Sequence, residues 1–189
     1  TLFFFFFLNA PYGQKFKEEI IQLSKKNVDW LIMIDVKAII VACNTATTNA
    51  INELRNSYNI PIIGIEPAIK PAAINTKTGI VGVLATQGTL NSSKYLESQT
   101  LYPQVTFINQ IGYKIVQLIE NGDLHSQELE QLLRSYINPM IDQNIDYLVL
   151  GCTHYPYLLP ILKKFLPEHI QVIDSGNAVA KQTHKILSN

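Results

Sequence analysis

The chain of 189 residues is predicted to have an α/β fold, with two pseudo-symmetric α/β/α domains that each contain a parallel sheet. Three observations predict this. Short apolar runs rich in Val and Ile alternate with longer amphipathic segments, which is the pattern of buried parallel strands covered by helices. Each half holds one apolar run that ends at a cysteine, Cys43 or Cys152. Ligands bind beyond the carboxyl ends of such strands, so the site is expected between the domains.

The first half alternates strand and helix. Its long helix is predicted because Phe16, Ile20 and Leu23 recur three or four residues apart, with lysines and glutamates between them. The predicted elements are a strand at 2–8, a turn at 9–13, a helix over 14–34, a strand at 38–42, a helix over 46–57 and a strand at 60–65.

The second half repeats the alternation after a polar break at 75–78, which is the predicted domain boundary. The run Tyr147-Leu148-Val149-Leu150-Gly151 is its clearest strand. The other predicted elements are a strand at 79–85, a loop at 86–89, a helix to about 99, a strand at 105–108, helices near 111–120, 126–143 and 157–165, a strand at 170–173 and a helix from about 176.

Composition excludes several classes of function. Fifteen basic and fifteen acidic residues are scattered along the chain, so no basic stripe predicts nucleic-acid binding. The apolar run 1–8 is too short to span a bilayer and lacks the features of a signal peptide. The chain does not start with Met, so it is expected to begin partway into a protein or after some removal.

Two cysteines in 189 residues, with no secretory signal, favour a reducing compartment and hence the cytoplasm. Each cysteine can be a small buried apolar residue, a disulfide partner or a zinc ligand. No CxxC or HxxxH spacing is present, so no metal site is predicted. Polar residues follow both cysteines directly, and this favours a chemical role over a place in the core.

Two thiols that flank one substrate can move a proton between its two faces. One, as thiolate, removes a proton from carbon, and the other, as thiol, returns one to the opposite side. This is racemisation or epimerisation without a cofactor. Asn44, Thr45 and Thr153 can hold the carboxylates of an amino acid, and His154 can tune the thiol beside it.

The cysteine segments resemble those of the glutamate racemases, within the aspartate/glutamate racemase superfamily. The matching segments are Val41-Ala42-Cys43-Asn44-Thr45-Ala46 and Gly151-Cys152-Thr153-His154-Tyr155-Pro156, with Pro11-Tyr12-Gly13 similar to the substrate-binding turn. Further matches include 64–72, 84–89, 118–122 and 173–176, so the resemblance covers nearly the whole chain.

The resemblance implies interconversion of L- and D-glutamate, which supplies D-glutamate for peptidoglycan, with no cofactor. It implies that Cys43 and Cys152 act on opposite faces and that His154 and Glu120 assist Cys152. Tyr12, Gly13, Asn44, Thr45, Thr153 and His154 would hold glutamate. The resemblance also implies that 172–189 joins 1–76 in the first domain and leaves 77–171 as the second. It allows a homodimer and implies no nucleic-acid or membrane partner.

The chain departs from this family pattern at its start. The family's first strand is followed by an Asp-Ser-Gly loop that supports the first cysteine, and no such segment precedes the match here. Asp174-Ser175-Gly176 matches a different, C-terminal family segment. Two alternatives are therefore kept: an inactive racemase-like protein that only binds a ligand or partner, and a racemase for another acidic amino acid such as aspartate.

Overall fold

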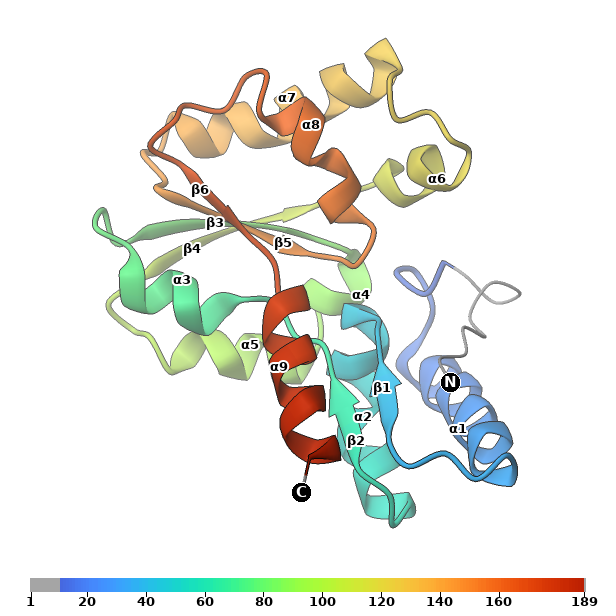
Figure 1. Ribbon diagram of the computed structural model, residues 1–189. Helices are drawn as coiled ribbons and strands as arrows, with labels where there is room; N and C mark the ends of the chain where they lie inside the picture. Colours follow the sequence, from blue (N-terminus) through green and yellow to red (C-terminus); the bar gives the residue numbers. More distant parts are fainter. Residues whose placement is uncertain (1–10, 189) are drawn as a thin grey trace.

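The computed structural model describes residues 11–188, and the predicted strand at 2–8 lies outside them. Within this range the chain forms two parallel sheets, one of two strands and one of four (Figure 1). The α/β fold class is confirmed. No helix in the described range has the length and apolar character needed to cross a bilayer.

The smaller sheet pairs β1 (Ile39–Val41) with β2 (Ile62–Gly64), joined in parallel by α2 (Asn44–Ser57). Helix α1 (Lys17–Met33) packs along α2 and encloses a core with it and the strands. The predicted helix over 14–34 is three residues too long at its start, because residues 12–15 form a turn closed by a bond from the Lys15 N–H to the Tyr12 carbonyl.

The larger sheet has the strand order β4-β3-β5-β6, and every pair is parallel. Its members are β3 (Ile80–Ala85), β4 (Thr106–Ile111), β5 (Tyr147–Gly151) and β6 (Gln171–Ile173). Ala85 pairs with Gly151, so the residues that follow β3 and β5 emerge side by side at the carboxyl edge.

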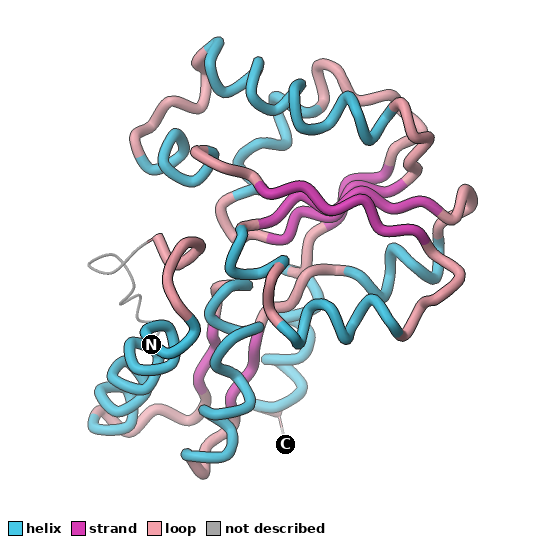
Figure 2. The backbone as a smooth tube through the Cα atoms, turned by 180° about the vertical axis from the view of Figure 1, so that it is seen from behind, coloured by secondary structure: helices cyan, strands magenta, loops and turns pink. Residues whose placement is uncertain are grey.

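Helices cover both faces of this sheet (Figure 2). The sequence requires this, because β3 and β5 are apolar on both faces. Leu84, Leu148 and Leu150 face one core and Val81, Val83 and Val149 the other. The first core is closed by α6 (Ile115–Glu120), α7 (Gln127–Ile141) and α8 (Leu159–Leu162), the second by α3 (Ile69–Asn75) and α5 (Ser93–Thr100).

Three expectations about local structure are wrong. Residues 69–75 form helix α3, where no helix was predicted. The segment after β3, predicted as a loop at 86–89, contains the short helix α4 (Gln87–Leu90). The predicted helix over 157–165 is instead a 3₁₀ turn, η2 (Tyr155–Leu158), followed by the one-turn α8. Prolines at the start of both short pieces leave N–H groups missing, which breaks a continuous helix.

The chain crosses between the sheets at two neighbouring points, after β2 and after β6. There the Ser175 hydroxyl donates to the Glu66 carbonyl, and α9 (Gly176–Leu187) then contacts β2 (Figure 1). Helix α3 packs on the larger sheet and β6 pairs with β5. The expected domain limits, 1–76 with 172–189 and 77–171, stay a prediction.

Candidate active site

A cavity of about 540 Å³ lies between the carboxyl edges of the two sheets and contains both cysteines. Its size is in the ordinary range for small-molecule sites. The residues that line it come from the turn before α1, both cysteine loops, the end of β3, and α6 with the loop after it: Pro11, Tyr12, Gly13, Ala42, Cys43, Thr45, Thr86, Val116, Ile119, Glu120, Leu124, Cys152, Thr153, His154 and Tyr157.

Cys43 is the N-cap residue of α2. Its Sγ accepts a hydrogen bond from the Ala46 N–H at 3.5 Å, so the thiol stands at the positive end of a helix of 14 residues. Desolvation nevertheless raises the pKa of Cys43, and the hydrogen bonds from Ala46 and Thr45 offset only part of that effect. The helix end favours a thiolate here but does not offset the cost of burying the charge.

Cys152 follows β5 directly and is buried. Burial raises its pKa to about 12, against hydrogen bonds from the backbone of His154 and Tyr155 that lower it. The negative charge of a Cys43 thiolate would raise the pKa of Cys152 further, so the two thiols interact electrostatically. Both cysteines are free thiols, so the disulfide alternative does not apply.

His154 links Cys152 to Glu120. Its Nδ1 lies 3.8 Å from the Cys152 Sγ, and its Nε2 contacts the Glu120 Oε1. Glu120 is the last residue of α6, 34 positions away in sequence, so the fold brings this carboxylate to the imidazole. A thiol, an imidazole and a carboxylate therefore form a continuous chain on the Cys152 side.

The predicted binding residues differ in what they offer the cavity. Thr45, Thr153 and Gly13 line it, as does Tyr12. The Tyr12 phenol is largely buried; burial raises its pKa, while a hydrogen bond with Asn27 lowers it. Asn44 is buried beside Cys43 and is not among the lining residues, and its Oδ1 has no hydrogen-bond partner within the described part of the chain.

Thr86 is a lining residue that the sequence analysis missed as a site residue. It follows β3 directly, just as Cys152 follows the neighbouring β5. Its hydroxyl lies 2.7 Å from the Thr45 Oγ1, and both lie within 3.2 Å of the Thr89 Oγ1. The strand-end rule that singled out the cysteines would also have found Thr86.

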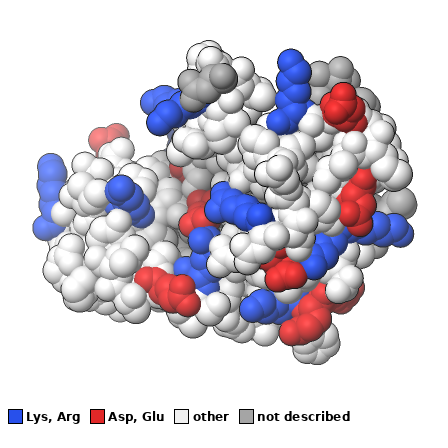
Figure 3. Space-filling model, turned by 90° about the horizontal axis from the view of Figure 1, so that it is seen from below, with Lys and Arg blue, Asp and Glu red and all other residues white. Residues whose placement is uncertain are grey.

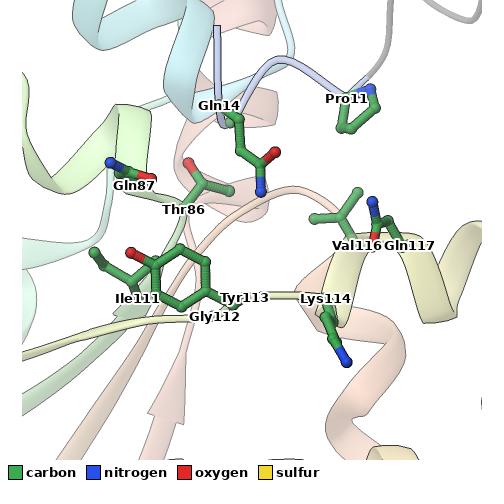
Figure 4. A pocket seen from close by; sticks show the side chains of 11 residues that line it. Pro11, Gln14, Thr86, Gln87, Ile111, Gly112, Tyr113, Lys114, Val116 and Gln117 are labelled. Atoms are coloured by element: carbon green, nitrogen blue, oxygen red, sulfur yellow. The ribbon is translucent and has the colours of Figure 1, made fainter.

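A small recess of about 50 Å³ adjoins the cavity and shares Pro11, Gly13, Thr86 and Val116 with it. The rest of its wall consists of Gln14, Gln87, Ile111, Gly112, Tyr113, Lys114 and Gln117 (Figure 4). Its volume suits a water molecule or two rather than a second ligand.

The cavity is poor in formal charge. Neither Lys nor Arg is among the described residues that line it, and Glu120 is its carboxylate. Within residues 11–188 no three His, Cys, Asp or Glu side chains are grouped as a metal ion would require. Outside the cavity, basic and acidic side chains are interspersed on the face shown in Figure 3.

Comparison with known proteins identifies the family. The family model described as Asp/Glu/Hydantoin racemase matches residues 14–183. The chain belongs to this racemase family. This racemase-family chain is 42% identical over 181 residues to a glutamate racemase of Ralstonia pickettii, covering 95% of the chain and 64% of that relative.

Solved structures agree with the family assignment. A glutamate racemase isoform of Bacillus anthracis has a TM-score of 0.86 and 32% identity, covering 96% of this chain and 69% of that one. A glutamate racemase of Escherichia coli, in complex with L-glutamate and an activator, has a TM-score of 0.86 and 34% identity, covering 97% and 70%. The racemase-family chain thus spans about two thirds of the length of the proteins it matches.

Proposed function

We propose that this chain carries the two-cysteine site of a cofactor-independent glutamate racemase, an isomerase that interconverts L- and D-glutamate. The observation that supports this most is a single cavity lined by one cysteine from the smaller sheet and one from the larger. The relatives named glutamate racemase, and the Escherichia coli relative described in complex with L-glutamate, support the choice of substrate.

In this proposal the α-carbon of glutamate lies between the two sulfurs. The thiolate on one side removes the α-proton, and the thiol on the other side delivers a proton to the opposite face, so the products are the other enantiomer and a reversed pair of protonation states. Inversion needs both thiols, because a single thiol can only return a proton to the face from which it came.

Burial raises the pKa of both thiols, so the proposed mechanism needs groups that favour a thiolate. At Cys152, the proton can pass to His154 Nδ1 while Nε2 donates to Glu120, which stabilises the imidazolium that forms. At Cys43, the α2 N-terminus and the substrate ammonium group favour the anion. The two faces thus use different groups for the same task.

Neutral donors bind the substrate carboxylates in this proposal, because no lysine or arginine is among the described lining residues. Hydroxyls of Thr45, Thr86 and Thr153 lie on the wall, and the first N–H groups of α2 point toward an anion at its start. Tyr12 and Gly13 shape the same side of the cavity.

The proposal extends to the cell. D-glutamate made by this reaction supplies peptidoglycan and so cell wall biogenesis and cell shape, and the cytoplasm keeps both thiols reduced. Neither cofactor, nucleic acid nor membrane takes part, and a homodimer is compatible with the proposal.

A substrate panel tests the activity. Optical rotation is followed with L-glutamate, D-glutamate and both enantiomers of aspartate, using the wild type, Cys43→Ala and Cys152→Ala. We expect the wild type to abolish the optical rotation of either glutamate enantiomer. We expect both variants to leave the rotation unchanged. Turnover of aspartate alone would favour the aspartate racemase. Absence of any turnover, with calorimetric binding of glutamate, would favour an inactive binding protein and overturn the proposal.

A further inference from the structure

Asn49 lies one turn into α2, the helix that begins beside Cys43. Its Nδ2 donates to the Thr45 carbonyl at 2.8 Å within α2, and to the Gly88 carbonyl at 2.8 Å in α4. Helix α4 follows β3 of the larger sheet. One half-buried amide group therefore joins α2, beside the smaller sheet, to α4, which follows β3 of the larger sheet.

The peptide groups of Gly88 are held from two directions. The Gly88 N–H donates to the Gly13 carbonyl at 2.8 Å, and its carbonyl accepts from Asn49. A Cβ at Gly88 would come within 2.7 Å of the Thr45 Cγ2 and 3.1 Å of the Gly13 carbonyl oxygen, so α4 packs closely against the side chain of Thr45 on α2. The contact also lies beside the Thr45–Thr86 hydroxyl pair on the cavity wall.

This contact bears on the spacing of the thiols. Cys43 moves with the start of α2, while Cys152 stands at the end of β5, whose neighbour β3 leads into α4. The position of α2 against α4 therefore sets how far apart the two sulfurs lie. An error of about 1 Å in the placement of reacting groups can cost on the order of 10²-fold in rate.

We propose that Asn49 is a positioning residue that fixes the separation of the two thiols by holding α2 on α4, the short helix after β3. The inference rests on the proposed racemase function and deepens it. Asn49 does not line the cavity that holds the thiols, so it acts through Thr45 and Gly88 rather than on the substrate.

The matched control is Asn75. Its Nδ2 donates to the Pro71 carbonyl four residues earlier in α3, just as Asn49 donates to Thr45, but within residues 11–188 its side chain makes no hydrogen bond to the smaller sheet or its helices. Asn75→Ala therefore removes the same kind of bond within a helix and leaves the contact between the sheets intact. Asn49→Asp keeps the size of Asn49 but has no N–H to donate.

In D₂O, NMR measures incorporation of deuterium at the α-carbon while optical rotation measures inversion. Asn49→Ala and Asn49→Asp should lower inversion by about 10-fold and raise the ratio of exchange to inversion, because one thiol still works on its own face. KM should change little. Asn75→Ala should keep the wild-type ratio. If exchange and inversion fall in equal proportion, their ratio stays at the wild-type value. That result would show a structural role only and overturn the proposal.

Amide hydrogen exchange separates this inference from the proposed function. Asn49→Ala should speed exchange at the Gly88 N–H, while Asn75→Ala should not. A wild type that neither exchanges nor inverts glutamate would overturn the proposed racemase function. An unchanged Gly88 exchange rate would overturn the role of Asn49 whatever the activity.

Discussion

The side chains of Cys152, His154 and Glu120 contact one another in series along the cavity wall. They meet because α6 brings Glu120 to the loop after β5. The side chains of His154 and Glu120 are 30% and 43% exposed, so their contact adds little to stability. Its value in this account lies in stabilising a protonated imidazole at the moment the thiol loses its proton.

Glu120→Gln should lower kcat/KM for glutamate by about 10²-fold, the low end of contributions from acid–base groups. The variant keeps the size of the side chain but removes the charge that stabilises the imidazolium. The thermal unfolding midpoint should stay close to that of the wild type. The control is Glu97→Gln, which replaces an exposed residue of α5 outside the cavity. A Glu120→Gln protein with wild-type kcat/KM would remove Glu120 from the mechanism.

The raised pKa of Cys152 predicts that its thiol is alkylated slowly near neutral pH. In Cys43→Ser, iodoacetamide should react with Cys152 more slowly at pH 8 than with a free cysteine, and the rate should climb from pH 9 toward pH 12 as the thiolate forms. Mass spectrometry at timed intervals follows the reaction. A rate at pH 7 equal to that of an exposed low-pKa thiol would contradict the burial argument.

The strand-end pattern led to both cysteines and to His154, which all line the cavity, because a strand end can be recognised from local sequence. It could give no reason from the residues for Glu120, which the family resemblance supplied, since a contact across 34 positions depends on the tertiary fold. It also gave no warning that burial would outweigh the helix end at Cys43.

At the scale of elements, the turn before α1 and the short helix α4 meet at Gly13 and Gly88. A Cβ at Gly13 would lie 2.9 Å from the Thr86 Cβ, and one at Gly88 would lie 2.7 Å from the Thr45 Cγ2. Glycine is needed at both positions because threonine side chains already fill the space that a Cβ would occupy.

Gly88→Ala should separate these segments and lower both activity and stability, with about 1–3 kcal/mol lost as in other overpacked sites. Adding Thr45→Ser removes the methyl group that the new Cβ meets and keeps the hydroxyl bonded to Thr86. Part of the loss should therefore be recovered in the double variant. Urea denaturation and racemisation rates measure both. Gly88→Ala with unchanged stability would show that the contact is loose.

Strong periodic helices and apolar strands were predictable as elements, whereas short helices were not. Helix α3 has seven residues and includes Pro71, so neither its length nor its composition indicates a helix. It forms because Ile69, Ala72 and Ala73 pack on the larger sheet. Tertiary packing of this kind leaves no local signal.

For the whole molecule, the link between α3 and β3 is held by one carboxylate. Asp146, buried at the start of β5, accepts from the Thr76 hydroxyl at 2.6 Å and from the N–H groups of Lys77 and Thr78. Burial by itself would raise the pKa of Asp146, but these hydrogen bonds outweigh it and the pKa is lowered. The stabilisation is therefore present above the pKa of an unfolded aspartate, about 3.9, and is lost as the pH falls through the lowered value.

Asp146→Asn should lower the free energy of unfolding at pH 7 by about 1–3 kcal/mol, because buried N–H groups lose a charged acceptor. The difference from the wild type should shrink below about pH 4, because there the unfolded wild-type chain binds a proton at Asp146 while the folded chain, with its lowered pKa, still resists protonation. Urea denaturation between pH 3 and pH 7 measures this. Asp142→Asn, an exposed change at the end of α7, should have little effect. A difference that does not depend on pH would contradict the role of the charge.

The central claim is that one substrate lies between Cys43 and Cys152. NMR of L-glutamate and D-glutamate in D₂O, with the wild type, Cys43→Ala and Cys152→Ala, tests it most directly. The account predicts that the wild type incorporates deuterium with inversion from either enantiomer and that both variants lose inversion. A variant with either cysteine removed that still inverts glutamate at the wild-type rate would contradict it.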